Sequence, residues 1–221
     1  MKNQYFALCG LVLLMSAVLG DSFFDGYDKD KLLERVMTID VNEDPGRLRD
    51  ASESFVTRFP QDENIDEVRI KLLASYVGSK RYITAKVYAD RLLGNPLVKE
   101  AYKEDVEYYK LMATVNSSQH WMAMLLKQKD IFRNQYALNE ALSRLEVFLA
   151  TYPNSGYRDE LLEIKQALRE AIANHELGIA YHYVQKDNLA AARIRMERYF
   201  DQFSDIDSPF LNKLSAYPEL W

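Results

Sequence analysis

The chain has 221 residues, of which 48% are hydrophobic and 28% charged, and its formal net charge is −5. This length and apolar content suffice for the core of one or two domains. The negative charge and the lack of a basic stripe argue against a nucleic-acid partner, because such proteins neutralise phosphates with clustered Lys and Arg. Gly and Pro number only 8 and 6, which favours helices over a turn-rich β fold.

The N-terminal segment differs from the rest of the chain. Lys2 is followed by an apolar run over residues 5–19, then by Gly20 and the acidic Asp21. A positive charge, a short apolar run and small residues before an acidic start are typical of a signal peptide. We therefore expect residues 1–20 to be removed. The alternative is an uncleaved anchor, although the run is shorter than the roughly 20 residues that a spanning helix needs.

Cys9 is the only cysteine, and it lies inside this apolar run. The mature chain would then contain neither a disulfide nor a thiol nucleophile. Lipid attachment at Cys9 is an alternative, but Leu8 stands where a small residue is normally required.

The chain after residue 20 has mostly helical periodicity. We expect a lead-in helix within 21–44, followed by a long helical region over 45–203 and a short tail over 204–221. The predicted helices span 29–38, 45–58, 62–78, 81–94, 97–116, 134–151, 157–185 and 188–202, and the stretch 117–133 is left unassigned. Asp44 and Pro45 supply an N-cap and a first-turn proline, and further prolines follow three of the helices.

One pattern recurs along the helical region: an alanine, an apolar residue four positions later and another four beyond that. It occurs at Ala51, Phe55 and Phe59, at Ala85, Ala89 and Leu93, at Ala141, Leu145 and Leu149, and at Ala192, Met196 and Phe200. A spacing of four keeps side chains on one helical stripe. The interval from Ala51 to Ala85 is 34 residues, the period of tetratricopeptide repeats, whereas the later intervals are longer.

Two aromatic residues support these repeats. Tyr76 and Tyr183 each stand nine residues before a pattern alanine, where the first helix of a repeat would pack against the second. The sequence thus predicts an all-α solenoid of about four tetratricopeptide helix pairs over 45–203. The alternative is an irregular helical bundle in which the alanines serve only core packing.

No catalytic or metal-binding motif is present. Of the three histidines, His120, His175 and His182, the last two are seven residues apart, whereas metal pairs on a helix usually lie four apart. There is no glycine-rich phosphate loop and no G-x-S-x-G. We expect a non-catalytic scaffold without metal or cofactor, and the alternative of an enzyme on a helical scaffold has no convergent site to support it.

Tyrosines are numerous, at 15, and several fall close together. Four of them are candidates for lining a concave groove that binds an extended or aromatic-ended peptide: Tyr76, Tyr82, Tyr88 and Tyr109. For any single one of them, core packing is the simpler interpretation.

The segment 135–203 carries a resemblance to a known family. It contains the turn Tyr-Pro-Asn-Ser-Gly-Tyr over 152–157, then a long helix with Glu176 and Tyr183, and a repeat that ends near Phe203. This segment resembles the later repeats of the BamD family, and Arg-Phe-Pro over 58–60 is similar to part of its first repeat. The resemblance covers most of residues 45–203.

The resemblance implies a function. BamD proteins are periplasmic subunits of the machinery that assembles β-barrel proteins at the inner face of the outer membrane. Their expected partners are unfolded outer-membrane proteins, the periplasmic domains of the barrel subunit BamA, and other subunits of the complex. The family's docking arginine falls on Arg195, with Arg193 and Arg198 nearby. We expect Arg195 to point away from the helix's core positions, among them Phe200.

The chain departs from the family in two respects. Family members are lipoproteins with a cysteine at the end of the signal segment, where this chain has Gly20 and Asp21. The family also has a fifth repeat, which we do not expect here, so docking contacts beyond Phe203 are in doubt. An alternative is another envelope repeat protein that coordinates cell-wall synthesis with division, but such proteins usually add a coiled coil and no sustained heptads appear.

Overall fold

The computed structural model describes Phe24, residues 26–125 and residues 135–221, except for the side chains of 119–125. These residues form nine α-helices, two short 3-10 helices and no strand, which confirms the expected all-α fold of tetratricopeptide type. The expected signal peptide and Cys9 lie outside the described residues. The chain divides into two compact units: unit 1 runs to Arg81 and includes 96–102, and unit 2 comprises 82–95 and 103–221.

Unit 1 is built from three helices with well-defined starts. It contains α2 (Lys29–Thr38), α3 (Pro45–Arg58), α4 (Ile65–Gly78) and the 3-10 helix η1 (Glu100–Tyr102). The side chain of Asp44 accepts a hydrogen bond from the backbone N–H of Arg47 at 2.9 Å, and Pro45 occupies the first turn. The Asp-Pro start of this helix is therefore as predicted.

The core of unit 1 holds the segment before α2. Phe24 is buried together with apolar residues of the three helices. The guanidinium of Arg58 at the end of α3 donates to the carbonyl oxygens of Phe24 at 3.1 Å and Tyr27 at 2.6 Å. At Gly78 a Cβ atom would lie 3.0 Å from Cβ of Pro45, so the start of α3 approaches the end of α4 too closely for a larger residue.

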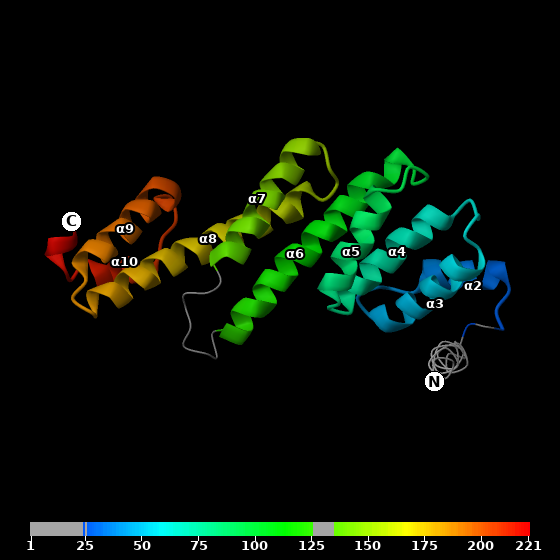
Figure 1. The fold of residues 1–221 in the computed structure, drawn as a ribbon, viewed down its shortest axis with the longest axis horizontal. Helices are drawn as coiled ribbons and strands as arrows, with labels where there is room; N and C mark the ends of the chain where they lie inside the picture. The colour runs from blue at the N-terminus through cyan, green and yellow to red at the C-terminus, as the bar shows by residue number, and fades with distance from the viewer. Residues whose placement is uncertain (1–23, 25, 126–134) are drawn as a thin grey trace, which may run out of the picture. The chain divides into compact units, whose positions relative to one another are not determined.

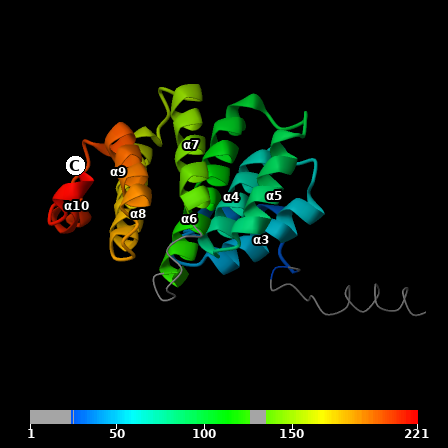
Figure 2. The same ribbon diagram turned by 60° about the vertical axis from the view of Figure 1, so that its left-hand side comes forward.

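Unit 2 contains the longer helices. They are α5 (Tyr82–Leu93), α6 (Lys103–Leu125), α7 (Gln135–Thr151), α8 (Arg158–Val184), α9 (Leu189–Phe203), α10 (Pro209–Leu214) and the 3-10 helix η2 (Pro218–Leu220). Within this unit α6 packs against α5 and α7, and α8 packs against α7, α9 and α10 (Figure 1). Figure 2 shows α8 and α9 alongside each other as a helical hairpin.

The four pattern alanines, Ala51, Ala85, Ala141 and Ala192, are all fully buried. The third position of the pattern was wrong at Phe200, which is 41% exposed, and the buried residue there is Tyr199. Leu93 and Leu149 are only partly buried, and Leu92 and Phe148 are buried one residue before them. Phe59, the third position of the first pattern, does pack against the core of unit 1. At 100° per residue, a spacing of eight drifts 80° from the alanine and a spacing of seven only 20°.

Several predicted bounds also needed correction. The helix predicted from residue 62 begins at Ile65, because the Asp62 side chain accepts from the backbone N–H of Asn64 and forms a turn there. The helix predicted over 97–116 begins at Lys103 and continues to Leu125. The expected tail, 204–221, contains α10, which packs on α8, and η2, which packs on α9.

Candidate partner-binding site

Helix α9 begins at a turn that its sequence specifies. Asp187 adopts a left-handed conformation with φ of 57°, which Asp tolerates better than most residues. The Asn188 side chain then caps α9 by accepting from the backbone N–H of Ala191 at 3.1 Å. This turn brings α9 back along α8, so residues near the start of α9 face the second half of α8.

Arg195 lies at the border of the buried stripe of α9. It stands three residues after Ala192, only about 60° from it around the helix. Its Nη1 atom donates to Oε2 of Glu176 on α8 at 2.9 Å and to Oε1 of Gln135, the first residue of α7, at 3.2 Å. The Arg195 side chain is 22% exposed and that of Glu176 only 3%. We expected Arg195 to point away from the core positions of its helix. Instead, residues of α7 and α8 hold its side chain along the edge of the buried stripe.

The other two predicted arginines lie elsewhere on α9. Arg193 is exposed, and its Nη2 donates to the backbone carbonyl oxygen of Glu219 in η2. Arg198 is exposed as well. The structure therefore does not bring the three arginines together into one cluster. Among the described residues, Arg195 is the one of the three that contacts a buried carboxylate.

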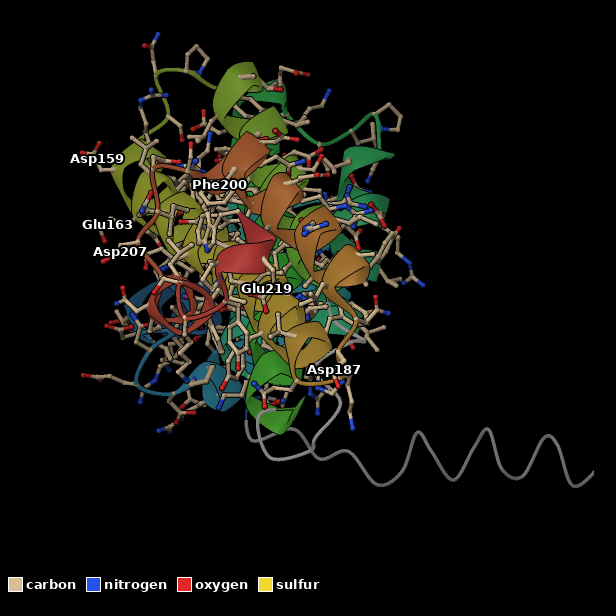
Figure 3. The ribbon with its side chains drawn as sticks, turned by 90° about the vertical axis from the view of Figure 1, so that its left-hand side faces the viewer. Asp159, Glu163, Asp187, Phe200, Asp207 and Glu219 are labelled. Carbon is tan, nitrogen blue, oxygen red and sulfur yellow. The ribbon has the colours of Figure 1, made fainter. Side chains whose placement is uncertain are left out.

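An aromatic pair marks a second face of α9. The ring of Phe200 meets that of Trp221 edge-on, with centroids 5.7 Å apart, and Trp221 is 62% exposed. Figure 3 shows Phe200 and Glu219 on the side of unit 2 that faces the viewer. Sequence reasoning assigned Phe200 to the core and did not consider Trp221.

A second arginine joins the other end of the α8–α9 hairpin. Arg169 on α8 donates from Nη1 and Nη2 to the two carboxylate oxygens of Asp205, at 2.8 and 2.7 Å, and Nη2 also donates to the carbonyl oxygen of Gln202 at 3.3 Å. Arg169 holds the pKa of Asp205 below its ordinary value through this hydrogen bonding. Sequence reasoning missed this pair, which lies 36 residues apart.

Two tyrosine–carboxylate pairs connect α6 with the start of α8. The rings of Tyr108 and Tyr157 stack with centroids 3.6 Å apart. Tyr108 donates its hydroxyl to Glu160 at 2.9 Å, and Tyr157 donates to Asp105 at 2.6 Å. Burial, followed by these hydrogen bonds to carboxylates, raises the pKa of both phenols above the ordinary value.

The four tyrosines proposed to line a groove occupy different environments. Tyr76 belongs to unit 1, where it is buried and donates to Glu53 at 2.8 Å. In unit 2, Tyr82 and Tyr88 lie half-buried on α5, and Tyr109 lies half-buried on α6 beside Tyr108. The residues in unit 2 thus keep surface that a ligand can reach, whereas Tyr76 is mainly a core residue.

A cavity that the sequence did not predict lies between α6 and α7. Its volume is about 300 Å³, and its lining includes Leu111 and Lys110 from α6 with Val147 and Phe148 from α7 and Tyr152 just after that helix. Val147 is 63% exposed at this place. Lys110 pairs with Asp90 of α5 at 2.9 Å, which leaves a mainly apolar surface between paired charges.

The described residues contain no group of three or more His, Cys, Asp or Glu side chains placed to hold a metal ion. None of the helices in the described part of the chain combines the length and the apolar character that crossing a bilayer requires.

The fold and the side-chain arrangement define a class of protein: an all-helical repeat protein of tetratricopeptide type with an arginine set among three helices. The chain belongs to the YfiO family of outer membrane lipoproteins, whose model matches residues 41–216. It is also 20% identical over 157 residues to a protein of Pasteurella multocida (strain Pm70) named outer membrane protein assembly factor BamD. That match covers 70% of this chain and 59% of the relative's length.

Proposed function

We propose that this chain is a non-catalytic scaffold for the assembly of β-barrel proteins into the outer membrane. It acts in the periplasm, associated peripherally with the inner face of that membrane. The family match over 41–216 carries this proposal, and the name of the Pasteurella relative agrees with it. Helical repeats commonly present extended surfaces for binding other proteins, which suits a role that needs no cofactor.

We assign Arg195 to docking on the periplasmic domains of BamA. The geometry supports this assignment, because within the described part of the chain only the Nη1 atom of Arg195 makes hydrogen bonds. Its other guanidinium nitrogens leave a planar edge that matches a carboxylate. Arg193 and Arg198 flank this site on more exposed parts of α9 and contribute less, since exposed ion pairs are usually weak.

Unfolded outer-membrane proteins would bind elsewhere, on the half-buried tyrosines of unit 2. Tyr82, Tyr88 and Tyr109 combine apolar rings with polar hydroxyls, as peptide-binding surfaces often do. Replacing each tyrosine by a photo-crosslinking amino acid and adding an unfolded barrel protein tests this assignment. Adducts at these three positions and none at the buried Tyr76 are expected; adducts spread evenly over exposed control positions such as Ile83 would contradict it.

The docking assignment is tested by measuring binding of the purified protein to the periplasmic domains of BamA. Arg195→Ala would leave Glu176 buried without its cation, so a change in binding could reflect unfolding. Arg195→Lys is the sharper variant, because lysine keeps the charge beside Glu176 and loses the planar fork. We expect Arg195→Lys to weaken binding at least tenfold and Arg193→Lys and Arg198→Lys to change it less than threefold, taking about 1.4 kcal/mol per factor of ten.

A pull-down from envelope extracts adds an independent check. Capture of BamA supports the assembly function. Capture of cell-division proteins without BamA, together with no binding to its purified domains, would favour the alternative of a cell-wall and division adaptor.

A further inference from the structure

Three side chains from three helices form a closed ring of hydrogen bonds around Arg195. Gln135 on α7 donates from Nε2 to Oε1 of Glu176 on α8. Arg195 on α9 donates from Nη1 to Oε2 of Glu176 at 2.9 Å and to Oε1 of Gln135 at 3.2 Å. Each residue of the ring contacts both of the others.

The directions of these hydrogen bonds determine which residue types fit. Position 176 must supply two acceptors, which an ionised carboxylate does and an amide cannot. Position 135 must supply one donor and one acceptor, which is what a glutamine amide offers. Turning the Gln135 amide over would set its Nε2 against Nη1 of Arg195, a contact between two donors, so the ring itself fixes the orientation of the amide.

The ring leaves one edge of the guanidinium unused. Nη1 carries two hydrogens, and both are directed at ring partners. No contact within the described part of the chain occupies Nε or Nη2 of Arg195, whose side chain is 22% exposed. The two N–H groups along this edge are parallel, which is the arrangement that binds both oxygens of one carboxylate.

We propose that Glu176 and Gln135 are positioning residues that fix Arg195 so that its Nε–Nη2 edge accepts one carboxylate side chain of the docking partner. This inference rests on the proposed function and names the chemistry of the contact. A free arginine must lose much of its rotational freedom when it binds, whereas Arg195 has already lost it on folding. The buried Glu176 would thus strengthen binding without touching the partner.

The ring also predicts which rate constant changes. Glu176 neutralises the charge of Arg195, so the site exerts little long-range attraction on an acidic partner. Its contribution should therefore appear in the dissociation rate constant, since close and geometrically defined contacts act there and diffuse rim charges act on association.

The same hairpin contains a matched control. Arg169 is 24% exposed, close to Arg195, but both of its terminal nitrogens are occupied by Asp205. Asp205→Asn and Glu176→Gln each convert the acidic partner of an α8–α9 arginine into its amide. Only Glu176→Gln should alter docking, because only Arg195 has an edge left for a partner.

The test measures association and dissociation of the full chain with the purified periplasmic domains of BamA, by surface plasmon resonance. The variants are Glu176→Gln, Arg195→Lys, the two combined, Gln135→Leu and Asp205→Asn. We expect Glu176→Gln to raise the dissociation rate constant about tenfold, with association changed less than twofold. Gln135→Leu, which alters the ring from a half-buried position, should act in the same direction, and Asp205→Asn should change neither rate.

The combined variant decides between positioning and general damage. If Glu176 acts through Arg195, Glu176→Gln should add no further loss once Arg195 is lysine. An equal loss in both backgrounds, or an equal loss for Asp205→Asn, overturns the inference. Wild-type binding that Arg195→Lys leaves unchanged overturns the inference and the docking assignment of Arg195, but it leaves the scaffold function standing. If the wild-type chain does not bind at all, that function is overturned as well.

Discussion

Two arginines at opposite ends of the α8–α9 hairpin each bind a carboxylate, but only one of them keeps an edge of its guanidinium available. Arg169 and Arg195 are similarly exposed, at 24% and 22%. Arg169 on α8 pairs with Asp205 just beyond the end of α9, and Arg195 on α9 pairs with Glu176 on α8. Their acidic partners differ, because the side chain of Asp205 is 60% exposed and that of Glu176 only 3%. Exposure of the arginine alone does not distinguish the two sites.

The distinguishing feature is the part of the guanidinium that each carboxylate occupies. Asp205 accepts hydrogen bonds from both terminal nitrogens of Arg169, so neither of these nitrogens is left to bind a partner protein. One carboxylate oxygen of Glu176 accepts from Gln135 and the other from Arg195, so Glu176 binds only one nitrogen of the guanidinium. A buried carboxylate that also accepts a hydrogen bond from a glutamine can therefore hold an arginine in place and still leave one edge of the guanidinium available.

Breaking the buried pair by removing its arginine should have the largest effect on stability. Arg195→Ala leaves the carboxylate of Glu176 at 3% exposure without its cation, and the loss of one partner of a buried pair is costly. We expect the free energy of unfolding to fall by about 2–3 kcal/mol, less than for a fully enclosed pair because Arg195 is partly solvated. Urea denaturation of Arg195→Ala against Arg195→Lys measures it; equal midpoints would show that Glu176 does not depend on the cation.

A core substitution supplies the reference for stability without docking. Ala141 is fully buried on α7, and a larger side chain there must displace neighbouring atoms. Ala141→Leu should lower the free energy of unfolding by about 1–3 kcal/mol and leave binding to the BamA domains unchanged below its melting temperature. An unchanged denaturation midpoint would mean that this packing has room to spare. Ala150→Leu, on the exposed side of the same helix, is the matched control.

A third carboxylate contact, away from both arginines, should have a smaller effect. Tyr157→Phe removes the hydroxyl that Asp105 accepts at 2.6 Å, which should cost about 1 kcal/mol at neutral pH. Because burial raises the pKa of Tyr157 in the folded state, its phenol stabilises the fold below the ordinary tyrosine pKa. That stability is lost as the pH rises above it. The stability of the variant should decline less steeply in alkali, and parallel curves would refute this role.

Local periodicity predicted much of the fold, because it depends on residues close in sequence. The buried alanines followed from apolar residues spaced four apart, the start of α3 from the neighbouring Asp44 and Pro45, and most helix ranges from helical periodicity. Phe200 was misplaced because a spacing of eight was counted as staying on the stripe. The short helices after Phe203 were missed because six and three residues give no usable period.

The candidate site was predictable only in part. The resemblance singled out Arg195, but the residues that hold it could not be inferred from helical spacing. Glu176 stands 19 residues before it and Gln135 stands 60 before it, and each contact depends on how whole helices pack. Glu176 was noted as one residue of a recognisable helix, and only the structure gives it a partner.

The smallest expected effect is the pH dependence of the ion pair between Arg169 and Asp205. Hydrogen bonding to Arg169 lowers the pKa of Asp205 in the folded state below its ordinary value of 3.8. A carboxylate with a lowered pKa stabilises the fold above its unfolded pKa, and that stability is lost as the pH falls through the folded pKa. Asp205→Asn should therefore melt at a slightly lower temperature than the wild type near neutral pH, and the difference should shrink below pH 3.8.

Added salt provides an independent check on the contribution of the Arg169–Asp205 ion pair to stability. Asp205 is largely exposed, so screening should weaken its pairing with Arg169. Melting curves of both proteins, recorded at neutral and acidic pH with and without added salt, measure the difference. If it persists unchanged in acid, Asp205 acts through its shape or its neutral hydrogen bonds. The two sites would then differ only in how deeply the acidic residue is buried. The number of guanidinium nitrogens that each carboxylate binds would not explain the difference.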